Sequence, residues 1–477
     1  MSQNESVILI LMHASCIFRH FCFFTAGLFL LFAGPGGRAQ QASPAPGNNP
    51  AATSADPEFL ATADEVMNEM AEITGWKVKT PLKKSIRTRA EIHAYILAEM
   101  DDEKDAQERY ASARSAEAFG LLPKNFDLDH FLVDLLTEQI AGLYDPKKHE
   151  FYIADWIQPD EQRMVMSHEL THALQDQYFH IDAWARAAKP NDDAELARES
   201  VLEGSAMAGM LEYEMRDKGL KLTDIPDIDP SIFVGDLNDT PMLKKAPQFI
   251  KDSLMFPYFD GLRFSMSILR GGGWAGFAPV FDRPPTGTQQ IMHPLLYREN
   301  KQPVAVKVDL PDGVPDDGWT KLEENIMGEF GWKEVLKQFL DEERAKKVMT
   351  GWDGDDYATY EQKDNKQNLM LFTRVHFDSP ELASGFFAAY RDALKRKYPE
   401  RTIRADAAND LEFKSSSSVK VFFRCEADEC ITLEGGDASI WEKWTKKLGW
   451  PATATPVPAN TVHSRPIRKQ SVPAFAA

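Results

Sequence analysis

The sequence has little positive charge, few cysteines and no apolar run long enough for a stable membrane span, and each shortage argues against a class of protein. With 54 Lys and Arg against 73 Asp and Glu, the formal net charge is −19. Such a charge argues against nucleic acid or an anionic membrane surface as a partner, because both would repel the chain. The apolar run at residues 21–33 has 13 residues, fewer than the about 20 that cross a bilayer.

That apolar run has the features of an export signal. Arg19 precedes it, and Gly37 and Ala39 are small residues at the spacing that a signal peptidase requires. We therefore expect residues 1–39 to be a signal peptide, followed by a flexible linker at residues 40–56 that is rich in Ala, Pro, Asn and Ser. The mature protein would then be periplasmic or secreted, without a stable membrane span; retention of the run as an anchor is the alternative.

Export would leave a single pair of cysteines. Cys16 and Cys22 belong to the leader, and Cys425 and Cys430 remain in an oxidising compartment. Strand-like residues flank the four residues between them, so we expect a disulfide that closes a hairpin. A lone cysteine pair without a nearby histidine is a poor metal site, and we assign this disulfide a structural role.

The remaining chain reads as two folded regions of an α+β protein, with 43% hydrophobic and 27% charged residues. Residues 57–303 are expected to be mainly helical with a small sheet, residues 304–449 to form a smaller helical and α+β region, and residues 450–477 to be a disordered tail.

The pattern of apolar and turn residues predicts the elements of both regions. The expected helices of the first region lie at 57–75, 88–119, 126–141, 161–179, 197–208, 244–253 and 261–269, with a hairpin at 142–145 and 150–153 and a turn at 271–274. The second region is expected to contain a strand at 304–308, helices between 322 and 350, a loop at 351–355, strands at 356–362 and 368–377, a helix at 380–397, the cysteine hairpin and a helix at 440–448.

One motif has a direct chemical meaning, the sequence H-E-L-T-H at residues 168–172. It lies in the predicted helix 161–179, where no Gly or Pro occurs. Residues four apart on a helix share one face, so His168 and His172 can offer two imidazole nitrogens to one ion. Glu169 lies beside that ion without having to bind it. This arrangement is typical of a Zn²⁺ site with a neighbouring general base; the alternative is a surface helix with solvated histidines.

A catalytic zinc site needs a third protein ligand. A metzincin would have Gly three residues and His six residues after the second histidine, but this chain has Gln175 and Tyr178 there, which excludes that class. His180 follows where the helix is expected to end, a poor position for a converging ligand.

The better candidates lie in the predicted helix 197–208. Glu199 and Glu203 are one turn apart among small and apolar residues, and a glutamate on an apolar face is costly unless it is paired or metal-bound. One of them can bind the ion while the other supports a histidine from behind. The alternative is a helix with two solvent-facing acids, the usual place for Glu.

The two motif segments resemble known zinc peptidases. H-E-L-T-H-A at residues 168–173 is similar to the active-site helix of thermolysin-like enzymes, and L-E-G-S-A at 202–206 resembles the third-ligand segment of aminopeptidase-N-like enzymes. The chain is also similar to secreted bacterial H-E-x-x-H proteins through G-L-Y-D-P at 142–146 and Q-I-M-H-P at 290–294. Together these segments indicate the gluzincin group.

The resemblance implies a zincin-like catalytic domain in residues 57–303 with Zn²⁺ as its cofactor. It assigns His168, His172 and Glu203 as ligands and Glu169 as the base. It also implies that the hairpin before the motif helix offers an edge strand to the substrate backbone; a plain sheet edge is the alternative.

The chain departs from the thermolysin pattern at one position. Those enzymes have an Asp four residues after the ligand Glu, where this chain has Met207. A carboxylate that supports the ligands would then have to come from Asp176 or Glu199.

Peptide hydrolysis also needs a donor for the negative charge that develops on the carbonyl oxygen. In gluzincins this donor lies C-terminal to the third ligand, where the chain has Tyr258, His293 and Tyr297. Spacing does not choose among them, and each can be a packing or capping residue instead. We favour His293, because His is an unusual choice for packing alone.

These observations predict an exported zinc peptidase that acts on peptide or protein substrates. A zinc-bound water would attack the peptide carbonyl while Glu169 takes its proton. The alternative is a non-catalytic envelope binding or assembly protein stiffened by a metal. An esterase or deamidase with the same chemistry is a third possibility. The substrate, endo- or exopeptidase action and the oligomeric state are not determined by the sequence.

Overall fold

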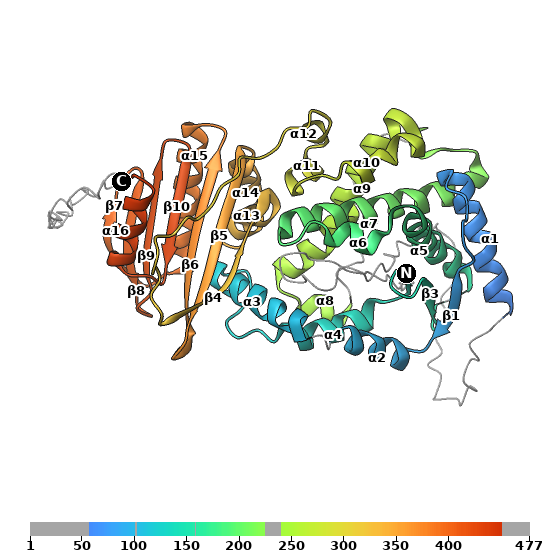
Figure 1. Ribbon diagram of the computed structural model, residues 1–477, viewed down its shortest axis with the longest axis horizontal. Helices are drawn as coiled ribbons and strands as arrows, with labels where there is room; N and C mark the ends of the chain where they lie inside the picture. The colour runs from blue at the N-terminus through green and yellow to red at the C-terminus, as the bar shows by residue number, and fades with distance from the viewer. Residues whose placement is uncertain (1–56, 101–102, 158, 225–239, 451–477) are drawn as a thin grey trace, which may run out of the picture.

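The computed structural model describes residues 57–100, 103–157, 159–224 and 240–450, which form a mixed α and β structure (Figure 1). The predicted leader and linker and nearly all of the predicted tail lie outside the described residues. None of the described helices is both long and apolar enough to cross a membrane.

The first region is a helical assembly that contains a small sheet. Its helices are α1 (Pro57–Thr74), α2 (Arg89–Met100), α3 (Glu103–Phe119), α4 (Leu128–Gln139), α5 (Pro159–Phe179), α6 (Ile181–Arg186), α7 (Asp192–Met215), α8 (Pro241–Lys245), α9 (Gln248–Phe277), α10 (Pro279–Asp282), α11 (Thr288–Met292) and α12 (Pro294–Arg298), with 3₁₀ turns at Arg216–Lys218 and Leu222–Asp224.

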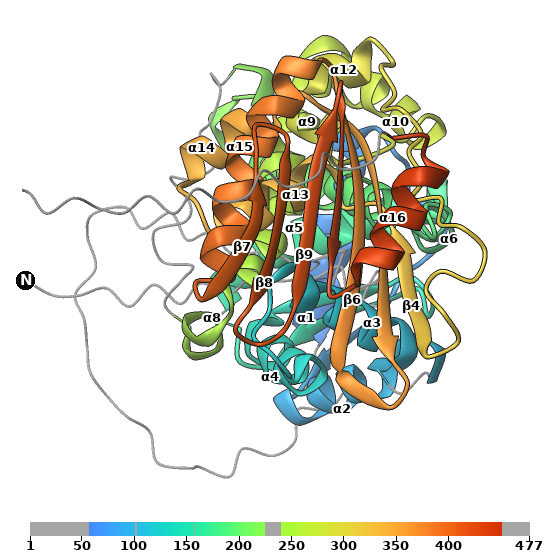
Figure 2. The same ribbon diagram turned by 90° about the vertical axis from the view of Figure 1, so that its left-hand side faces the viewer.

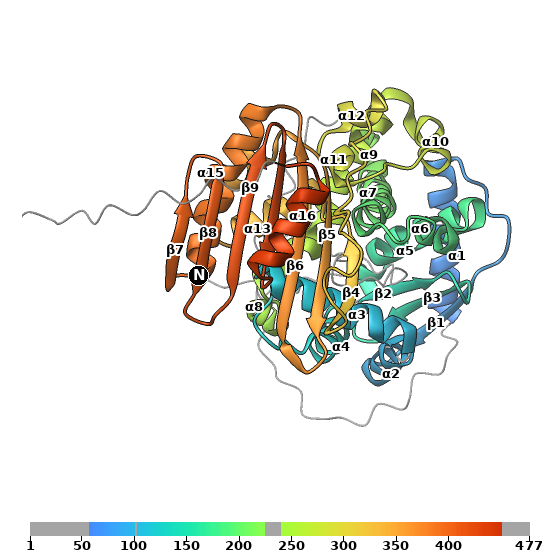
Figure 3. The ribbon, with the colours of Figure 1, turned by 60° about the vertical axis from the view of Figure 1, so that its left-hand side comes forward.

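The small sheet has the strand order β1-β3-β2, with β1 at Lys83–Arg87, β2 at Gly142–Asp145 and β3 at Glu150–Ala154. Strand β3 pairs with β1 in parallel and with β2 in the antiparallel sense. The hairpin of β2 and β3 is therefore where the sequence predicts it, whereas β1 was not predicted. Strand β2 is an edge of this sheet and lies beside α5 (Figure 3).

Helix α7 is the central element of this region, because it packs against α1, α5, α9 and α11. The Asn191 side chain accepts the Ala194 N–H and caps its start, and Asp192 and Asp193 lie in its first turn, where acids favour a helix N-terminus. Most of its residues are buried. The helix that holds the second motif is thus surrounded by protein.

Helix α9 is continuous where the sequence predicts two helices. Pro257 and Gly261 weaken a helix in isolation, but both are buried here, and packing against α7 compensates. The predicted turn at 271–274 is a kink inside α9, at Gly273, whose φ of 59° is left-handed.

The second region is built on a seven-stranded antiparallel sheet in the order β4-β5-β6-β10-β9-β8-β7 (Figure 2). Its elements are β4 (Trp319–Asn325), α13 (Gly328–Lys337), α14 (Glu342–Met349), β5 (Trp352–Gln362), β6 (Asn365–Phe377), α15 (Pro380–Lys397), β7 (Arg401–Asp406), β8 (Asp410–Ser415), β9 (Lys420–Glu426), β10 (Glu429–Glu434) and α16 (Ala438–Lys447).

Helices cover both faces of this sheet. Successive residues of a strand face opposite sides, and β9 shows this directly. Phe423 stacks on Phe387 of α15, while its neighbour Phe422 stacks on Trp441 of α16. In Figure 2, α16 lies in front of the sheet and α15 behind it.

Several predictions for this region are wrong. The segment predicted as helix from residue 322 begins with strand β4, and residues 304–308, predicted as a strand, belong to no strand. The loop predicted at 351–355 lies mostly in β5, and β7 and β8 were not predicted. Strand β7 is an edge strand with a polar, largely exposed sequence, which weakens the apolar alternation on which a strand prediction depends. Strand β8 does alternate, with Leu411 and Phe413 buried, but it is only six residues long.

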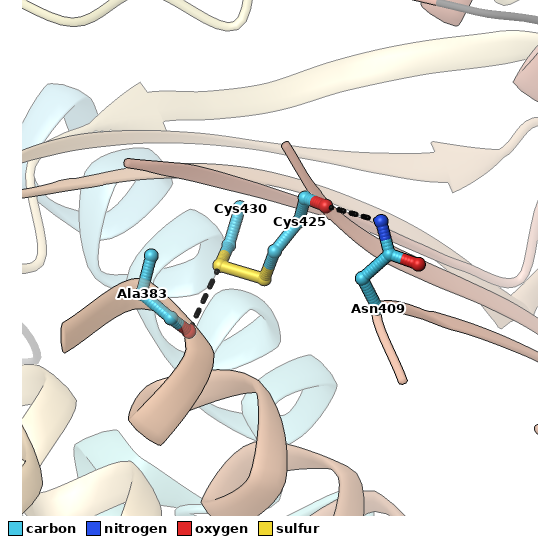
Figure 4. Close-up of a disulfide and its surroundings, with 4 residues drawn as sticks. All are labelled: Ala383, Asn409, Cys425 and Cys430. Atoms are coloured by element: carbon cyan, nitrogen blue, oxygen red, sulfur yellow. Dashed lines mark hydrogen bonds between the residues drawn. A yellow bond between two sulfur atoms is a disulfide. The ribbon is translucent and has the colours of Figure 1, made fainter. Parts of the chain in front are cut away.

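The predicted disulfide is confirmed. Cys425 and Cys430 are directly opposite each other on β9 and β10, with 4.0 Å between their Cα atoms (Figure 4). The Sγ of Cys430 lies 3.6 Å from the carbonyl oxygen of Ala383 in α15, and the side-chain amide of Asn409 donates to the carbonyl of Cys425. The disulfide therefore joins β9 to β10 at a point where the hairpin packs on α15.

The two regions share one hydrophobic cluster, which continues across the predicted boundary at residue 303. Helix α3 lies on the large sheet, where Tyr110 donates to Glu361 over 2.5 Å and Ser115 donates to Thr359 over 2.9 Å. The sheet region is therefore bound to the helical region by polar contacts as well as by the core.

Polar contacts also join the start of α7 to the large sheet region. The Asp192 N–H donates to the side-chain oxygen of Asn325 on β4 over 3.0 Å. The Thr288 hydroxyl donates to Asp193 and accepts the N–H of Phe330 in α13. A Cβ at Gly328, where φ is 74°, would lie 1.8 Å from the Asp193 carboxylate. Glycine is required there by both backbone conformation and space.

Helices α7 and α9 approach so closely that their contact has room only for glycine. A Cβ on Gly204 would lie 2.0 Å from the carbonyl carbon of Gly261, and one on Gly261 would lie 2.2 Å from the Ser200 carbonyl oxygen. Both clashes are with main chain, which cannot rotate away as a side chain can.

We therefore predict that Gly204→Ala lowers the free energy of unfolding by about 3 kcal/mol or more, because the helices must separate. Urea unfolding followed by circular dichroism measures this. Gly271→Ala is the control: it is a helical position of α9 with nothing within 4 Å of the added Cβ, and it should be neutral or stabilising by up to about 1 kcal/mol. Equal effects of the two variants would contradict the close-contact explanation.

Candidate metal centre and active site

The structure brings the two motif segments together at one point. Helix α5 carries His168 and His172 on one face, and α7 places Glu203 opposite them. The His168 Nε2 lies 3.1 Å from Glu203 Oε2 and 3.2 Å from His172 Nε2, and the third distance, from His172 Nε2 to Glu203 Oε2, is 3.5 Å. Two helices thus direct three donor atoms at one another.

This triangle fits a zinc ion. A tetrahedral site with ligand distances of about 2.0–2.1 Å has edges of roughly 3.3–3.4 Å between its donor atoms, close to the three distances here. Two imidazoles and one carboxylate are also the donor set of catalytic zinc sites, which keep the fourth position for water or substrate. The residues present therefore fit Zn²⁺.

The hydrogen bonds behind His172 hold it in the form that binds a metal. The Ser205 hydroxyl donates to the Val201 carbonyl, so its oxygen accepts from the Gln175 amide nitrogen at 2.8 Å. The Gln175 oxygen then faces His172 Nδ1 at 3.0 Å and accepts its proton. This tautomer follows from the network, and it leaves a lone pair on Nε2 directed at the other two donors.

Burial opposes charge on all three side chains. His168 and His172 are 0% exposed and Glu203 is 2% exposed. Desolvation lowers the pKa of His172 to about 3 and also lowers the pKa of His168, while it raises the pKa of Glu203 above its usual value. A divalent cation would remove this penalty, because it pairs with the carboxylate and with both lone pairs.

Glu169 lies beside the donor triangle and directs one carboxylate oxygen to strand β2. It is fully buried, and its Oε2 accepts the main-chain N–H of Tyr144 over 2.8 Å. The strand can come this close because Gly142 has no side chain: a Cβ there would lie 2.4 Å from a methyl carbon of Val165. The carboxylate proposed as the base is thus next to the ligands and is held by the edge strand.

Of the three residues considered as oxyanion donors, Tyr258 lies at the triangle. Its ring stacks on that of His168 with 6.2 Å between centroids, and its hydroxyl is hydrogen-bonded to Glu203. Burial first, and then Glu203 and Glu169, raise the pKa of Tyr258 well above its usual value. The hydroxyl therefore remains a proton donor. The glycine contact between α7 and α9 explains its position, because Tyr258 is one turn before Gly261.

The structure gives His293 and Tyr297 other partners. His293 lies between α11 and α12, and its Nε2 is 2.8 Å from Glu329 of α13. Tyr297 donates to the main-chain carbonyl of Arg283. The preference for His293 as oxyanion donor gains no support from these contacts. His180, the weak ligand candidate, is exposed at the start of α6.

The supporting carboxylate expected behind a ligand histidine is replaced by an amide, that of Gln175. Asp176 binds Tyr144 and His149 instead. Glu199 is buried near Tyr258, since its charge contributes to the raised pKa of that hydroxyl. The His168 Nδ1 has no hydrogen-bond partner among the residues that the structure describes.

The sequence reasoning missed two residues of the site, Gln175 and Ser205. A signal was present for the first, because Gln175 follows His172 by three residues and so lies on the same helix face. Ser205 had no such signal, since its role depends on how α5 and α7 pack.

Comparisons with known proteins cover only part of the chain. Residues 319–435, most of the large sheet region, match a family described as a domain of unknown function (DUF8575). No curated protein and no solved structure matches the chain. The matched family lies outside the segment that contains the donor triangle.

The donor triangle predicts zinc-dependent stability. Zn²⁺ at about 1,000 times its dissociation constant should raise the free energy of unfolding by about 4 kcal/mol, because the ion binds the folded state. Thermal unfolding of chelator-treated protein, with and without added Zn²⁺, measures this. Glu203→Ala and His172→Ala should each lose most of the shift, whereas His180→Ala should keep it. A shift that survives in both triangle variants would contradict the assignment.

The buried imidazole predicts an acid-labile fold for the metal-free protein. Unfolded His takes up a proton near pH 6.5, whereas folded His172 does so only near pH 3. Between these values the unfolded state binds more protons, so His172 makes stability fall as pH falls, by at most about 1.4 kcal/mol per pH unit.

His172→Gln isolates this effect, because other groups oppose it. Burial raises the pKa of Asp193 to about 6 and that of Asp355 to about 7. These two acids therefore make the free energy of unfolding fall as pH rises. Urea unfolding in chelator at pH 7, 6 and 5 should show wild type losing more stability toward low pH than His172→Gln. Parallel curves would contradict the prediction.

Proposed function

We propose that this protein is an exported zinc-dependent peptidase of the gluzincin type. The observation that carries the proposal is the convergence of His168, His172 and Glu203, with Glu169 adjacent to them and one of its oxygens directed to strand β2. A purely structural zinc site has no need of a fourth, unligated acid at that position. The motif helix, the third-ligand helix and an edge strand before the motif helix together support a zincin-like catalytic domain.

Bound at the triangle, Zn²⁺ would polarise the substrate carbonyl and lower the pKa of the attacking water. Glu169 takes the proton of that water and then passes it to the leaving amine. Tyr258, whose hydroxyl stays protonated, donates to the carbonyl oxygen as negative charge develops there. Gln175 holds the His172 ring in place throughout.

Export is the second part of the proposal. The leader predicted at residues 1–39 supports it, and so does the Cys425–Cys430 disulfide, because such bonds persist in oxidising compartments. The site of action would then be periplasmic or extracellular.

One observation favours the alternative, a non-catalytic envelope binding or assembly protein stiffened by a metal. The three donor side chains are almost completely buried, and an ion that only stiffens the fold needs no access for substrate. A peptidase would have to open a path to this centre.

Glu169→Gln separates these two functions. The substitution keeps size and leaves the donor triangle intact, so Zn²⁺ should still bind while kcat for a peptide library or casein falls by at least about 10³-fold. Cleavage products from wild type would also show whether it acts as an endo- or exopeptidase. Zinc binding with no cleavage by wild type would favour the non-catalytic protein, and cleavage retained by the variant would contradict the assigned base.

A further inference from the structure

Strand β2 is fixed along one face of α5 by contacts at three levels of the helix. At the first level Gly142 lies against Val165, where a side chain would not fit. At the second, the Tyr144 N–H donates to Glu169. At the third, the Tyr144 hydroxyl donates to Asp176 Oδ2 over 2.7 Å.

These contacts follow the periodicity of the helix. Glu169 and Asp176 are seven residues apart, which is about two turns, so both face the strand. A single residue, Tyr144, therefore spans the two acids, with its main chain on one and its side chain on the other. A shift of the Tyr144 main chain along the helix would therefore strain both contacts together.

The turn of the hairpin is fastened to the same acid. His149 lies in the turn between β2 and β3, with a φ of 49°, and its Nδ1 is 2.8 Å from Asp176 Oδ2. The His149 side chain is 69% exposed, whereas that of Asp176 is only 4% exposed. The other oxygen of Asp176 accepts the N–H of Ile181 at the start of α6. The buried carboxylate of Asp176 thus binds one residue before the β2–β3 turn and one within it, and connects the turn to α5.

We propose that Asp176 is a positioning residue for the general base. Through Tyr144 and His149 it holds β2 in the register at which the Tyr144 N–H stays on the Glu169 carboxylate. That hydrogen bond limits the rotation of the Glu169 carboxylate. The inference rests on the proposed function, because it takes Glu169 as the base.

A purely structural role for the same contacts is the competing explanation, and β2 provides a matched control. On the opposite face of this strand the Tyr95 hydroxyl of α2 donates to Asp145 Oδ2 over 2.8 Å. Tyr144→Phe and Tyr95→Phe therefore each remove one tyrosine hydroxyl from one buried carboxylate, Asp176 of α5 in the first case and Asp145 of β2 in the second. Only the first removes a tether that leads to Glu169.

The kinetic test compares these variants and Asp176→Asn in the zinc-loaded full chain with a fluorogenic peptide that wild type cleaves. Tyr144→Phe and Asp176→Asn should lower kcat about tenfold or more, with KM within about twofold and with zinc content unchanged. Tyr95→Phe should keep kcat within about twofold. Equal kcat losses in Tyr144→Phe and Tyr95→Phe, or unchanged kcat in the first, would overturn the inference.

A double-variant measurement tests whether the effect passes through Glu169. If it does, adding Tyr144→Phe to Glu169→Gln should cause no further loss of the residual rate, because the base is already removed. A further loss as large as that in wild type would show that Tyr144 acts independently of Glu169 and would overturn the inference.

Hydrogen exchange provides a readout that does not depend on activity. The Tyr144 amide should exchange faster in Asp176→Asn and Tyr144→Phe than in wild type, but not in Tyr95→Phe, as measured by mass spectrometry on peptides that cover residues 142–146. If wild type cleaves no peptide, the proposed function fails, and exchange alone decides whether Asp176 holds this amide. Unchanged exchange in both variants overturns the inference in either case.

Discussion

Three buried ligand atoms, brought together where burial opposes charge, are the constraint on which the rest of the site depends. His168, His172 and Glu203 meet at distances of 3.1 to 3.5 Å in the interior of the helical region. Hydrogen bonds alone satisfy such a triangle poorly, because the His172 Nε2 carries a lone pair set by Gln175 and desolvation opposes charge on every member. A divalent cation satisfies all three at once.

Two close contacts between neighbouring elements place the polar groups around this site. Gly204 and Gly261 let α9 contact α7, which brings the Tyr258 hydroxyl to Glu203, and Gly142 lets strand β2 contact α5, which brings a main-chain N–H to Glu169. Each of these two contacts places a hydrogen-bond donor against a glutamate of the site. The same close packing encloses the donors, so catalysis requires that this centre open to substrate.

The sequence predicted what local patterns encode and missed what packing determines. The motif helix, the β2–β3 hairpin and the cysteine hairpin follow from short-range periodicity and turn residues, and all three are present. Strand β7 lacks a clear alternation, and α9 contains Pro257 and Gly261, which the helix tolerates because they are buried in its packing against α7. Ser205 and the Tyr144 amide were unpredictable for the same reason, because their roles exist only once α5, α7 and β2 are assembled.

X-ray absorption at the zinc edge of the zinc-loaded protein, together with anomalous scattering from its crystals, tests the central claim most directly. We expect one ion with four nitrogen or oxygen neighbours at about 2.0–2.1 Å, located between His168 Nε2, His172 Nε2 and Glu203. Zinc bound elsewhere, or a triangle that stays empty at saturating Zn²⁺, would contradict it.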